Sequence, residues 1–324
     1  MTAHANASLE LTDLEPSSAD LTAQVVEGLS KPQKTLPTAF LYDEAGSDLF
    51  DQITDLPEYY PTRTELSIMD AHLPAMAEAI GPEAMIIEYG SGTGLKTRRL
   101  LGALDRPVAY VPVEISREFL MTSAEALNAE FPNIEVLPVC ADFTLPFEVP
   151  LAQTRARRRV LYFPGSTIGN FYRDFAIRLL RQMHAEVGKG GGALLGVDLK
   201  KDVDVLEAAY NDSAGVTAKF NLNLLERANR ELGCDFDLSA FRHRAVWNER
   251  RGAIEMRLYA RRPTAVTVGG KRFTLDRDEW IHSEDSHKYG LDEFAAMASK
   301  SGFDVKTVWT DADQLFSVQY LEAR

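Results

Sequence analysis

A short apolar segment followed by three alternating glycines constrains this chain more than any other feature. Residues 85–97 have the sequence MIIEYGSGTGLKT, in which an apolar run gives way to Gly90, Gly92 and Gly94. This order predicts a buried strand, a tight turn and the start of a helix. Glycine suits such a turn because it tolerates positive φ and lets a ligand approach the backbone.

The spacing of the glycines separates two classes of nucleotide-binding turn. The dinucleotide fingerprint is G-x-G-x-x-G, whereas here the glycines alternate and Leu95 stands at the position of its third glycine. Glu88 precedes the first glycine by two residues. The pattern E-x-G-x-G-x-G after an apolar strand resembles motif I of class I S-adenosylmethionine (SAM) methyltransferases. Alone, it is equally compatible with a purely structural turn.

Strand-like and helix-like segments alternate between about residues 84 and 198. After the first strand we expect strands at 108–114, 134–139, 160–163 and 193–198, with amphipathic helices between them. This alternation predicts a parallel, doubly wound α/β sheet. In such a sheet the loops at the carboxyl ends of the strands line the ligand crevice.

Polar residues follow several of these expected strands. Glu114 ends the second strand about 20 residues after the turn, where a carboxylate can accept from both ribose hydroxyls. Asp142 and Phe143 follow the third strand and suit an adenine, although an ordinary Asx turn is the alternative for Asp142. Asn170 follows the fourth strand, and its amide can donate to a carboxylate and accept from an amine.

The rest of the chain has a different rhythm. Residues 202–231 predict interrupted helices, and 241–247, 253–261 and 265–268 predict antiparallel strands, before a helix at 292–301 and a last strand at 303–309. Ahead of the first strand we expect loose order in residues 1–20, a short helix at 20–35 and a helix at 64–80. The aromatic residues between these two helices, including Tyr59 and Tyr60, either fill a core or form a lid of phenols over a site.

Composition narrows the classes of partner. The chain has 35 Lys and Arg against 48 Asp and Glu, a net charge of −13, so we expect a small-molecule substrate and no nucleic acid. The basic run at 155–159 precedes an expected strand and is interpreted as a solvated loop. No apolar run approaches a membrane span and no signal-peptide pattern is seen. Cys140 and Cys234 have no metal or disulfide spacing, which indicates a reduced, cytoplasmic protein.

A metal site is the weaker interpretation of the polar run at 280–289. His282 and His287 lie near Glu284 and Asp285, but no matching distant ligands stand out, and we expect no metal. The segment Gly165-Ser166-Thr167 lacks the G-x-S-x-G nucleophile turn, so no serine hydrolase is expected.

Five segments together resemble the L-histidine Nα-methyltransferases of ergothioneine biosynthesis (EgtD). They are YDEAGSDLF at 42–50, LPEYYPTR at 56–63, the glycine turn with Lys96-Thr97, GSTIGN at 165–170 and GVTAKFN at 215–221. The resemblance runs from about residue 35 to the C-terminus. It implies a Rossmann-like class I SAM-methyltransferase domain at 64–199, inserted into an α+β substrate-binding domain of residues 1–63 plus 200–324.

The resemblance also implies a set of site residues. The residues that would bind SAM are Gly90, Lys96, Glu114, Asp142 and Phe143. The residues that would bind histidine are Tyr59, Asn170, Tyr210, Met256, Glu284 and Ser286. Within that set, Asn170 and Tyr210 would hold the α-carboxylate, Glu284 and Ser286 the imidazole, and Met256 the side chain. Tyr42 would lie near the reacting amine. Gly94-Leu95 and Glu114 depart from the family pattern of Ser-Glu and Asp, which bears on cofactor affinity.

The implied reaction is Nα-trimethylation of L-histidine to hercynine by a monomer, with SAM converted to S-adenosyl-L-homocysteine. Such a transfer requires alignment of a neutral amine with the methyl carbon, and no metal. Three alternatives remain open: Nα-methylation of tyrosine or a tryptophan derivative, a nicotinamide oxidoreductase, and a non-catalytic SAM- or amino-acid-binding sensor.

Overall fold

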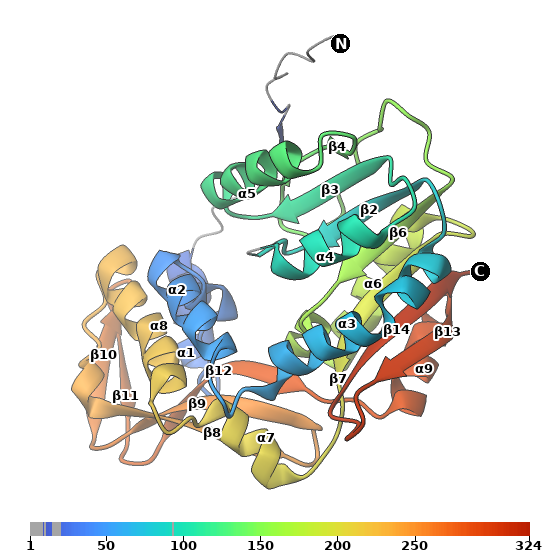
Figure 1. Ribbon diagram of the computed structural model, residues 1–324. Helices are drawn as coiled ribbons and strands as arrows, with labels where there is room; N and C mark the ends of the chain where they lie inside the picture. The colour runs from blue at the N-terminus through green and yellow to red at the C-terminus, as the bar shows by residue number, and fades with distance from the viewer. Residues whose placement is uncertain (1–8, 10, 15–20, 93) are drawn as a thin grey trace.

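The computed structural model describes residues 9, 11–14, 21–92 and 94–324 (Figure 1). Most of the segment expected to be loosely ordered, residues 1–20, therefore lies outside the described residues, as does Thr93 in the glycine turn.

The helices and strands follow one another as the sequence patterns predict, with the differences given below. The α-helices are α1 (Leu21–Ser30), α2 (Glu44–Thr54), α3 (Tyr60–Ile80), α4 (Leu95–Ala103), α5 (Arg117–Glu130), α6 (Arg173–Val187), α7 (Val203–Tyr210), α8 (Val216–Leu232) and α9 (Leu291–Lys300). The 3-10 helices are η1 (Thr38–Leu41), η2 (Thr167–Asn170) and η3 (Leu238–Ala240). The strands are β1 (Thr12–Asp13), β2 (Ala84–Tyr89), β3 (Ala109–Glu114), β4 (Glu135–Val136), β5 (Val139–Cys140), β6 (Arg158–Phe163), β7 (Gly192–Asp198), β8 (Phe241–Asn248), β9 (Ala253–Ala260), β10 (Thr264–Val268), β11 (Lys271–Leu275), β12 (Trp280–His287), β13 (Phe303–Thr310) and β14 (Phe316–Ala323).

The larger sheet has the strand order β1-β5-β3-β2-β6-β7-β14-β13, with β4 paired to β3. Its strands are parallel as far as β7, while β14 runs antiparallel to β7 and β13 antiparallel to β14. From β2 the chain builds outward to β3 and β5, then returns to add β6 and β7 on the other side. The order therefore reverses between β2 and β6, the position at which open α/β sheets bind ligands.

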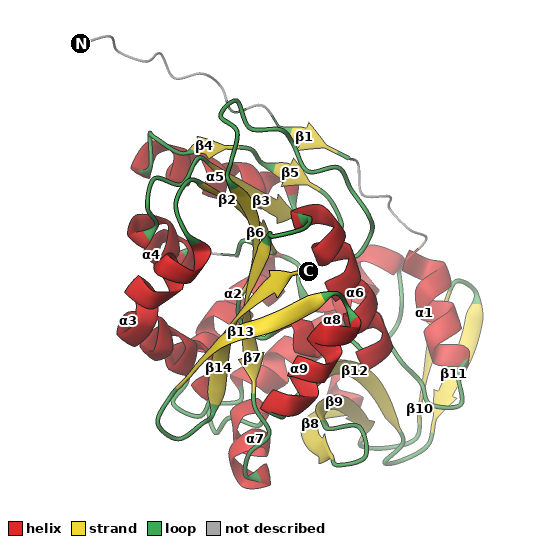
Figure 2. Cartoon of the chain, turned by 90° about the vertical axis from the view of Figure 1, so that its right-hand side faces the viewer, coloured by secondary structure: helices red, strands yellow, loops and turns green. Residues whose placement is uncertain are grey.

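Helices cover both faces of this sheet (Figure 2). On one face α3, α4 and α5 bury an apolar stripe, which in α3 comprises Ile68, Met69, Met76 and Ile80. On the other face α6 and α9 pack against the alternate residues of the same strands. The doubly covered strand β2 is buried at every position, which accounts for its continuous apolar run.

The second sheet is antiparallel, with the order β12-β9-β8, and the β10-β11 hairpin lies beside it. Its apolar core includes side chains from α1, α2, α7 and α8, and these helices lie beside the sheet in Figure 1. This is the α+β unit that the second half of the sequence predicts.

The C-terminal strands belong to the larger sheet, contrary to the predicted division at residue 199. Residues 316–322 of β14 pair with β7, and β13 adds outside β14. If each sheet is the core of one domain, α9, β13 and β14 join the first domain and not the second. The free edge of β7 accounts for this, because an unpaired central strand needs a partner for its backbone groups.

One further strand prediction was wrong, and four strands in the described part of the chain were not expected. The expected strand at 134–139 is split into β4 and β5 around Pro138, which has no amide hydrogen to donate to a ladder. The polar run at 280–287 is the strand β12, and β1, β11 and β14 were likewise not expected. Among the residues that the structure describes, no helix combines the length and apolar character needed to cross a membrane.

The two sheets are joined at the end of β7. The Tyr289 amide donates to Asp198 O at 3.0 Å and the Lys200 amide to Tyr289 O at 3.1 Å, a short parallel bridge. Beside it, η2 packs on β12, and a Cβ at Gly169 would stand 2.7 Å from His287 O. Only a glycine lets the backbone of the 164–171 loop approach β12 this closely.

Candidate active site

The glycine turn follows the carboxyl end of β2, and within it Gly92 is exposed while Gly94 is buried. Gly90 and Gly94 have φ of 69° and 72°, and Gly94 starts α4 from the left-handed region. Between them, the buried Ser91 hydroxyl has no hydrogen-bond partner among the described residues. A glycine turn at the start of a helix, with an unused hydroxyl, fits the amino-acid or nucleoside portion of a cofactor.

Glu88, the acidic residue of the glycine motif, lies behind this turn. Its carboxylate accepts hydrogen bonds from Thr97 Oγ1 at 2.8 Å and from the Tyr110 hydroxyl at 2.6 Å. Burial raises the pKa of Glu88 to about 8, against the opposing effect of these two donors. Glu88 therefore ties α4 to β2 and β3 and fixes the turn between them.

The loop after β5 brings an aromatic ring to the turn. Phe143 stacks on Tyr89 with ring centroids 5.0 Å apart, and a Cβ at Gly90 would lie 3.9 Å from its ring. Asp142 forms an Asx turn, because its Oδ1 accepts from both the amide and the hydroxyl of Thr144. The alternative of an Asx turn is therefore correct for this oxygen, while Asp142 Oδ2 accepts no hydrogen bond from any described residue.

Glu114 ends β3 beside the same turn. Its Oε1 accepts from the Ile115 amide at 2.9 Å, and burial raises the pKa of the carboxyl. Its remaining acceptor capacity fits a pair of ribose hydroxyls. Together the glycine turn, the Phe143 ring and the Glu114 carboxylate fit an adenosine-bearing cofactor such as SAM.

Lys96 does not stand alone at the start of α4. Its ammonium pairs with Glu65 of α3, which is 1% exposed, and Glu65 also accepts from the Gly165 amide at 2.9 Å. The pair thus lies between the ends of β2 and β6, where the strand order reverses. Glu65 carried no sequence signal, because it lies in an expected helix with no motif around it.

One face of the β9–β12 pair carries the residues predicted for the substrate side chain. Met256 and Glu284 are opposite each other in the strand pairing, so their side chains share a face. The Tyr42 hydroxyl donates to Glu284 Oε1 at 3.2 Å. Burial raises the pKa of Glu284 to about 7, while this hydrogen bond opposes the shift.

Aromatic rings surround this face. Tyr42 lies edge-on to Phe50 and Phe220 at 6.0 and 5.6 Å, and Tyr59 lies edge-on to Tyr210 at 6.0 Å. Asp43 holds the segment in place: its side chain caps α2 through the Gly46 amide and accepts from Asn223 of α8. These contacts are consistent with the lid of phenols and also with a packed core, since several of the rings are buried.

Tyr210 ends α7 and meets Ser286 of β12, with 2.8 Å between the two hydroxyl oxygens. Lys288, which no motif singled out, donates to both hydroxyls and to Asp198. The signal for it was period-two alternation, because 284, 286 and 288 point to one face of a strand. Asn170 is at the end of η2, which packs on the same strand.

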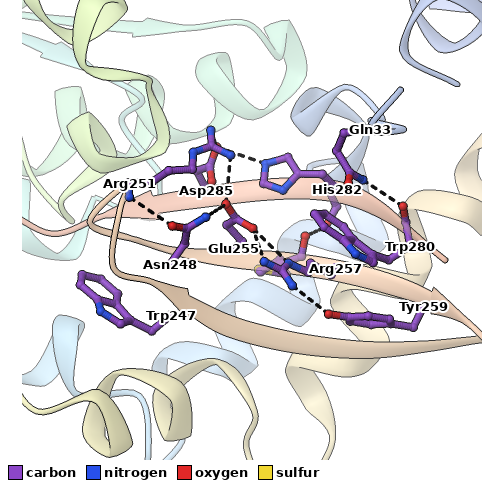
Figure 3. A network of polar contacts seen from close by, with 12 residues as sticks. Gln33, Trp247, Asn248, Arg251, Glu255, Arg257, Tyr259, Trp280, His282 and Asp285 are labelled. Carbon is purple, nitrogen blue, oxygen red and sulfur yellow. Dashed lines mark hydrogen bonds and ion pairs between the residues drawn. The ribbon is translucent and has the colours of Figure 1, made fainter. Parts of the chain in front are cut away.

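The opposite face of the second sheet carries a separate polar network (Figure 3). Glu255 accepts from Arg251 and Arg257, and Asp285 Oδ2 accepts from Arg251 and from His282 Nε2. A register shift in β12 between His282 and Glu284 puts His282 on the face of Asp285, so Glu284 lies on the other face from these two candidate metal ligands. No group of three or more metal-ligating side chains occurs within the described ranges.

Two surface hollows lie away from this constellation. One, of about 560 Å³, is lined by the start of β6, including the basic run at 155–159, and by residues 185–191. The other, of about 780 Å³, is lined by the segments before β3 and β4. Both are at the amino ends of parallel strands, whereas ligands of open α/β sheets bind outside the carboxyl ends.

Comparison with known proteins agrees with this geometry. A sequence model described as "Histidine-specific methyltransferase, SAM-dependent" matches residues 21–323. The chain is 40% identical over 297 residues to the histidine N-alpha-methyltransferase of Mycobacterium tuberculosis, covering 90% of this chain and 91% of the relative. It is 32% identical to ergothioneine biosynthesis protein 1 of Neurospora crassa, over 86% of this chain and 32% of that protein. It is 27% identical to the 4-dimethylallyltryptophan N-methyltransferase of Aspergillus fumigatus, over 93% and 92% of the two chains. The chain thus belongs to the family of histidine-specific, SAM-dependent methyltransferases.

Proposed function

We propose that this protein transfers methyl groups from SAM to the α-amine of L-histidine until hercynine is formed. The observation that carries the proposal is the convergence of Glu284, Ser286 and Tyr210 beside Met256 on one face of the second sheet. This face combines hydrogen-bonding groups for an imidazole with an apolar surface. Family membership and the 40% identity to a histidine N-alpha-methyltransferase support it.

The cofactor residues are proposed from their places around the glycine turn. Gly90 would let SAM approach the backbone. The Glu114 carboxylate would accept hydrogen bonds from the ribose hydroxyls of SAM, and Asp142 and Phe143 would contact its adenine. Lys96 would contribute to the SAM site at the point where the strand order reverses, and there its ammonium pairs with Glu65. When bound, SAM supplies an electrophilic sulfonium methyl group.

The remaining residues would orient the amine. Asn170 and Tyr210 would hold the α-carboxylate, and Glu284 and Ser286 the imidazole, so that only one nitrogen faces the cofactor. A positioned, neutral amine needs no metal or covalent nucleophile for displacement at a methyl carbon. Its proton would leave to solvent or through the Tyr42 hydroxyl. Aromatic faces of Tyr42, Tyr59 and Phe50 would accommodate the quaternary ammonium of the product.

Mass spectrometry of purified protein with SAM and L-histidine, beside L-tyrosine and L-tryptophan, tests the proposal. The expected product is histidine with three added methyl groups. Absence of methylated histidine, with SAM still bound, would overturn the substrate assignment.

The second candidate is Nα-methylation of a tryptophan derivative, favoured by the similarity to the Aspergillus fumigatus enzyme of that name. The buried pair of Glu284 and Ser286 argues for histidine, because an imidazole has two ring nitrogens that can meet both groups, whereas an indole has only one N–H. The same mass-spectrometric comparison separates the two substrates.

A place as the first step of ergothioneine synthesis is part of the proposal, supported by the similarity to ergothioneine biosynthesis protein 1. The monomeric state, the cytoplasmic location and the lack of nucleic-acid partners stay predictions. Both cysteines, Cys140 and Cys234, are free thiols, which is compatible with a reduced compartment.

A further inference from the structure

A fully buried lysine stands behind the proposed substrate-binding hydroxyls. Lys288 is 0% exposed, and its Nζ lies 2.6 Å from Asp198 Oδ2, 2.8 Å from the Tyr210 hydroxyl and 2.8 Å from Ser286 Oγ. An ammonium has three hydrogens to donate, and here each has an acceptor. Lys288 therefore has no donor left for a ligand.

The hydrogen bonds that Lys288 donates determine where the hydroxyl hydrogens of Tyr210 and Ser286 can point. Because both hydroxyl oxygens accept from Lys288, neither hydroxyl hydrogen can be directed at it. The 2.8 Å contact between Tyr210 and Ser286 uses one of these two hydrogens. The other hydrogen points away from the cluster and is the one that a ligand can receive.

The cluster behind the hydroxyls carries more positive than negative charge. Asp198 is bonded by Lys288, by Lys201 at 2.6 Å and by the Tyr60 hydroxyl at 2.8 Å. Within this hydrogen-bonded group, two ammonium groups and one carboxylate sum to one positive charge, and the carboxylates of Asp311 and Glu284 act on it from outside the group. Burial alone would raise the pKa of Asp198, yet Lys288 and Lys201 together lower it, so the carboxylate is ionised. The Lys201 side chain is only 6% exposed, so water screens the excess charge poorly.

We infer that Lys288 is a specificity-determining positioning residue, which directs the Tyr210 hydroxyl toward the α-carboxylate of the substrate and places its own ammonium charge directly behind that hydroxyl. In this arrangement Ser286 donates to Tyr210, and Tyr210 donates to the carboxylate. Ser286 is then left with an acceptor lone pair for an imidazole N–H. The inference rests on the proposed function and extends it, because Lys288 touches no substrate atom.

The arrangement explains how a carboxylate could be selected without an arginine. A neutral phenol donates more strongly when a cation bonds its oxygen, since the two hydrogen bonds polarise each other. An amide or ester at the same place carries no charge to be attracted. Lys288 should therefore enlarge the preference for L-histidine over L-histidinamide.

The test compares Lys288→Met with the wild-type chain in the presence of SAM. Methyl transfer to L-histidine and to L-histidinamide is followed by mass spectrometry, and KM and kcat are determined for each. We expect Lys288→Met to reduce the L-histidine preference in kcat/KM by about 10-fold or more, about 1.4 kcal/mol. Most of the change should be in KM for L-histidine, with kcat changed by less than about 3-fold.

Lys201→Met is the matched control, because Lys201 contacts Asp198 but neither substrate hydroxyl. The preference should change by less than about 3-fold in this variant. An unchanged preference in folded Lys288→Met would overturn the inference. An equal loss in both lysine variants would also overturn it, because the total charge of the cluster would then explain the effect.

A second variant covers the case in which Lys288→Met does not fold. Lys288→Met/Asp198→Asn removes the buried pair together, which avoids an unpaired carboxylate and leaves the cluster at one positive charge through Lys201. The inference requires the same loss of preference, and retention of the wild-type preference would contradict it. Failure of the proposed function gives a different result, because the wild-type protein would then produce no methylated histidine. The inference about Lys288 would then fail as well.

Discussion

The Tyr42 hydroxyl donates a 3.2 Å hydrogen bond to Glu284 Oε1, across 242 residues of sequence. It joins the segment before α2 to the proposed substrate face of β12. Phe50 and Phe220 pack edge-on against the Tyr42 ring and hold it over Glu284. The N-terminal segment thus completes a site whose floor is built by the C-terminal half of the chain.

Replacement of Glu284 by alanine should remove most of the selection for histidine. A site built to pair with a polar group discriminates by about 10⁴- to 10⁵-fold, and Ser286 retains part of this pairing. We expect kcat/KM for L-histidine to fall by about 100-fold. The affinity for SAM, measured by isothermal titration calorimetry, should be unchanged. Glu226→Ala, on an exposed turn of α8, is the control and should leave both quantities unchanged. Activity retained in Glu284→Ala would remove this carboxylate from the imidazole site.

A methyl group at Gly90 should weaken SAM binding beyond its effect on stability. Gly90→Ala puts an L-residue at φ 69°, which costs about 1 kcal/mol, and adds a Cβ between the turn and Phe143. Gly188→Ala also puts an L-residue at positive φ, 70°, at the end of α6, with no atom within 4 Å of the new Cβ. We expect a loss of unfolding free energy in both variants but a drop in SAM affinity of about 10-fold only for Gly90→Ala. Equal SAM affinities for the two variants would place the cofactor elsewhere.

Loss of the Lys96 charge should lower the free energy of unfolding, because it leaves the buried carboxylate of Glu65 without its ion pair. Lys96→Met leaves Glu65 buried with hydrogen bonds from the Gly165 amide alone, and breaking a buried pair in this way costs about 3 kcal/mol. The double variant Lys96→Met/Glu65→Gln removes the uncompensated charge and should recover more than half of that loss. Urea denaturation of the two single variants and the double variant provides the thermodynamic cycle. Additive losses would show that the two side chains are not coupled.

Folding stability should decrease as the pH rises from about 5 to 8, in part because of Glu88. Its pKa is about 8 in the folded protein and near 4.5 when unfolded, so the unfolded chain releases this proton first. Each pKa unit corresponds to about 1.4 kcal/mol, which makes the loss several kcal/mol by pH 8. Glu88→Gln should flatten this slope and be relatively more stable at pH 8 than at pH 5. Parallel wild-type and variant curves in urea denaturation would contradict the assignment.

The sequence predicted β2, β3, β6 and β7 of the larger sheet well because these strands are buried along most of their length. Such strands are continuous apolar runs, as β2 and β7 are, and the glycine turn marks the first of them. It predicted the C-terminal strands poorly, because only the pairing of β14 with β7 assigns them to this sheet. Pairing between segments over a hundred residues apart leaves no local pattern.

The proposed site shows the same limit. Tyr210, Glu284 and Ser286 came from motif resemblance, and the structure brings Tyr210 and Ser286 into contact and places Glu284 beside Tyr42. Glu65 and Lys288 escaped attention because each is an ordinary charged residue in sequence. Only burial beside an opposite charge makes them unusual, and burial is a property of the fold.

The backbone bridge between Asp198 and Tyr289 separates two kinds of evolutionary change. It sets the end of β12 against the end of β7 through main-chain atoms, which side-chain substitution leaves in place. At the proposed site, substitutions at positions such as 256 and 284 would change the surface offered to an amino acid without moving the ends of the two strands apart. Substrate choice would then change by point mutation, while the proposed geometry of methyl transfer stayed in place.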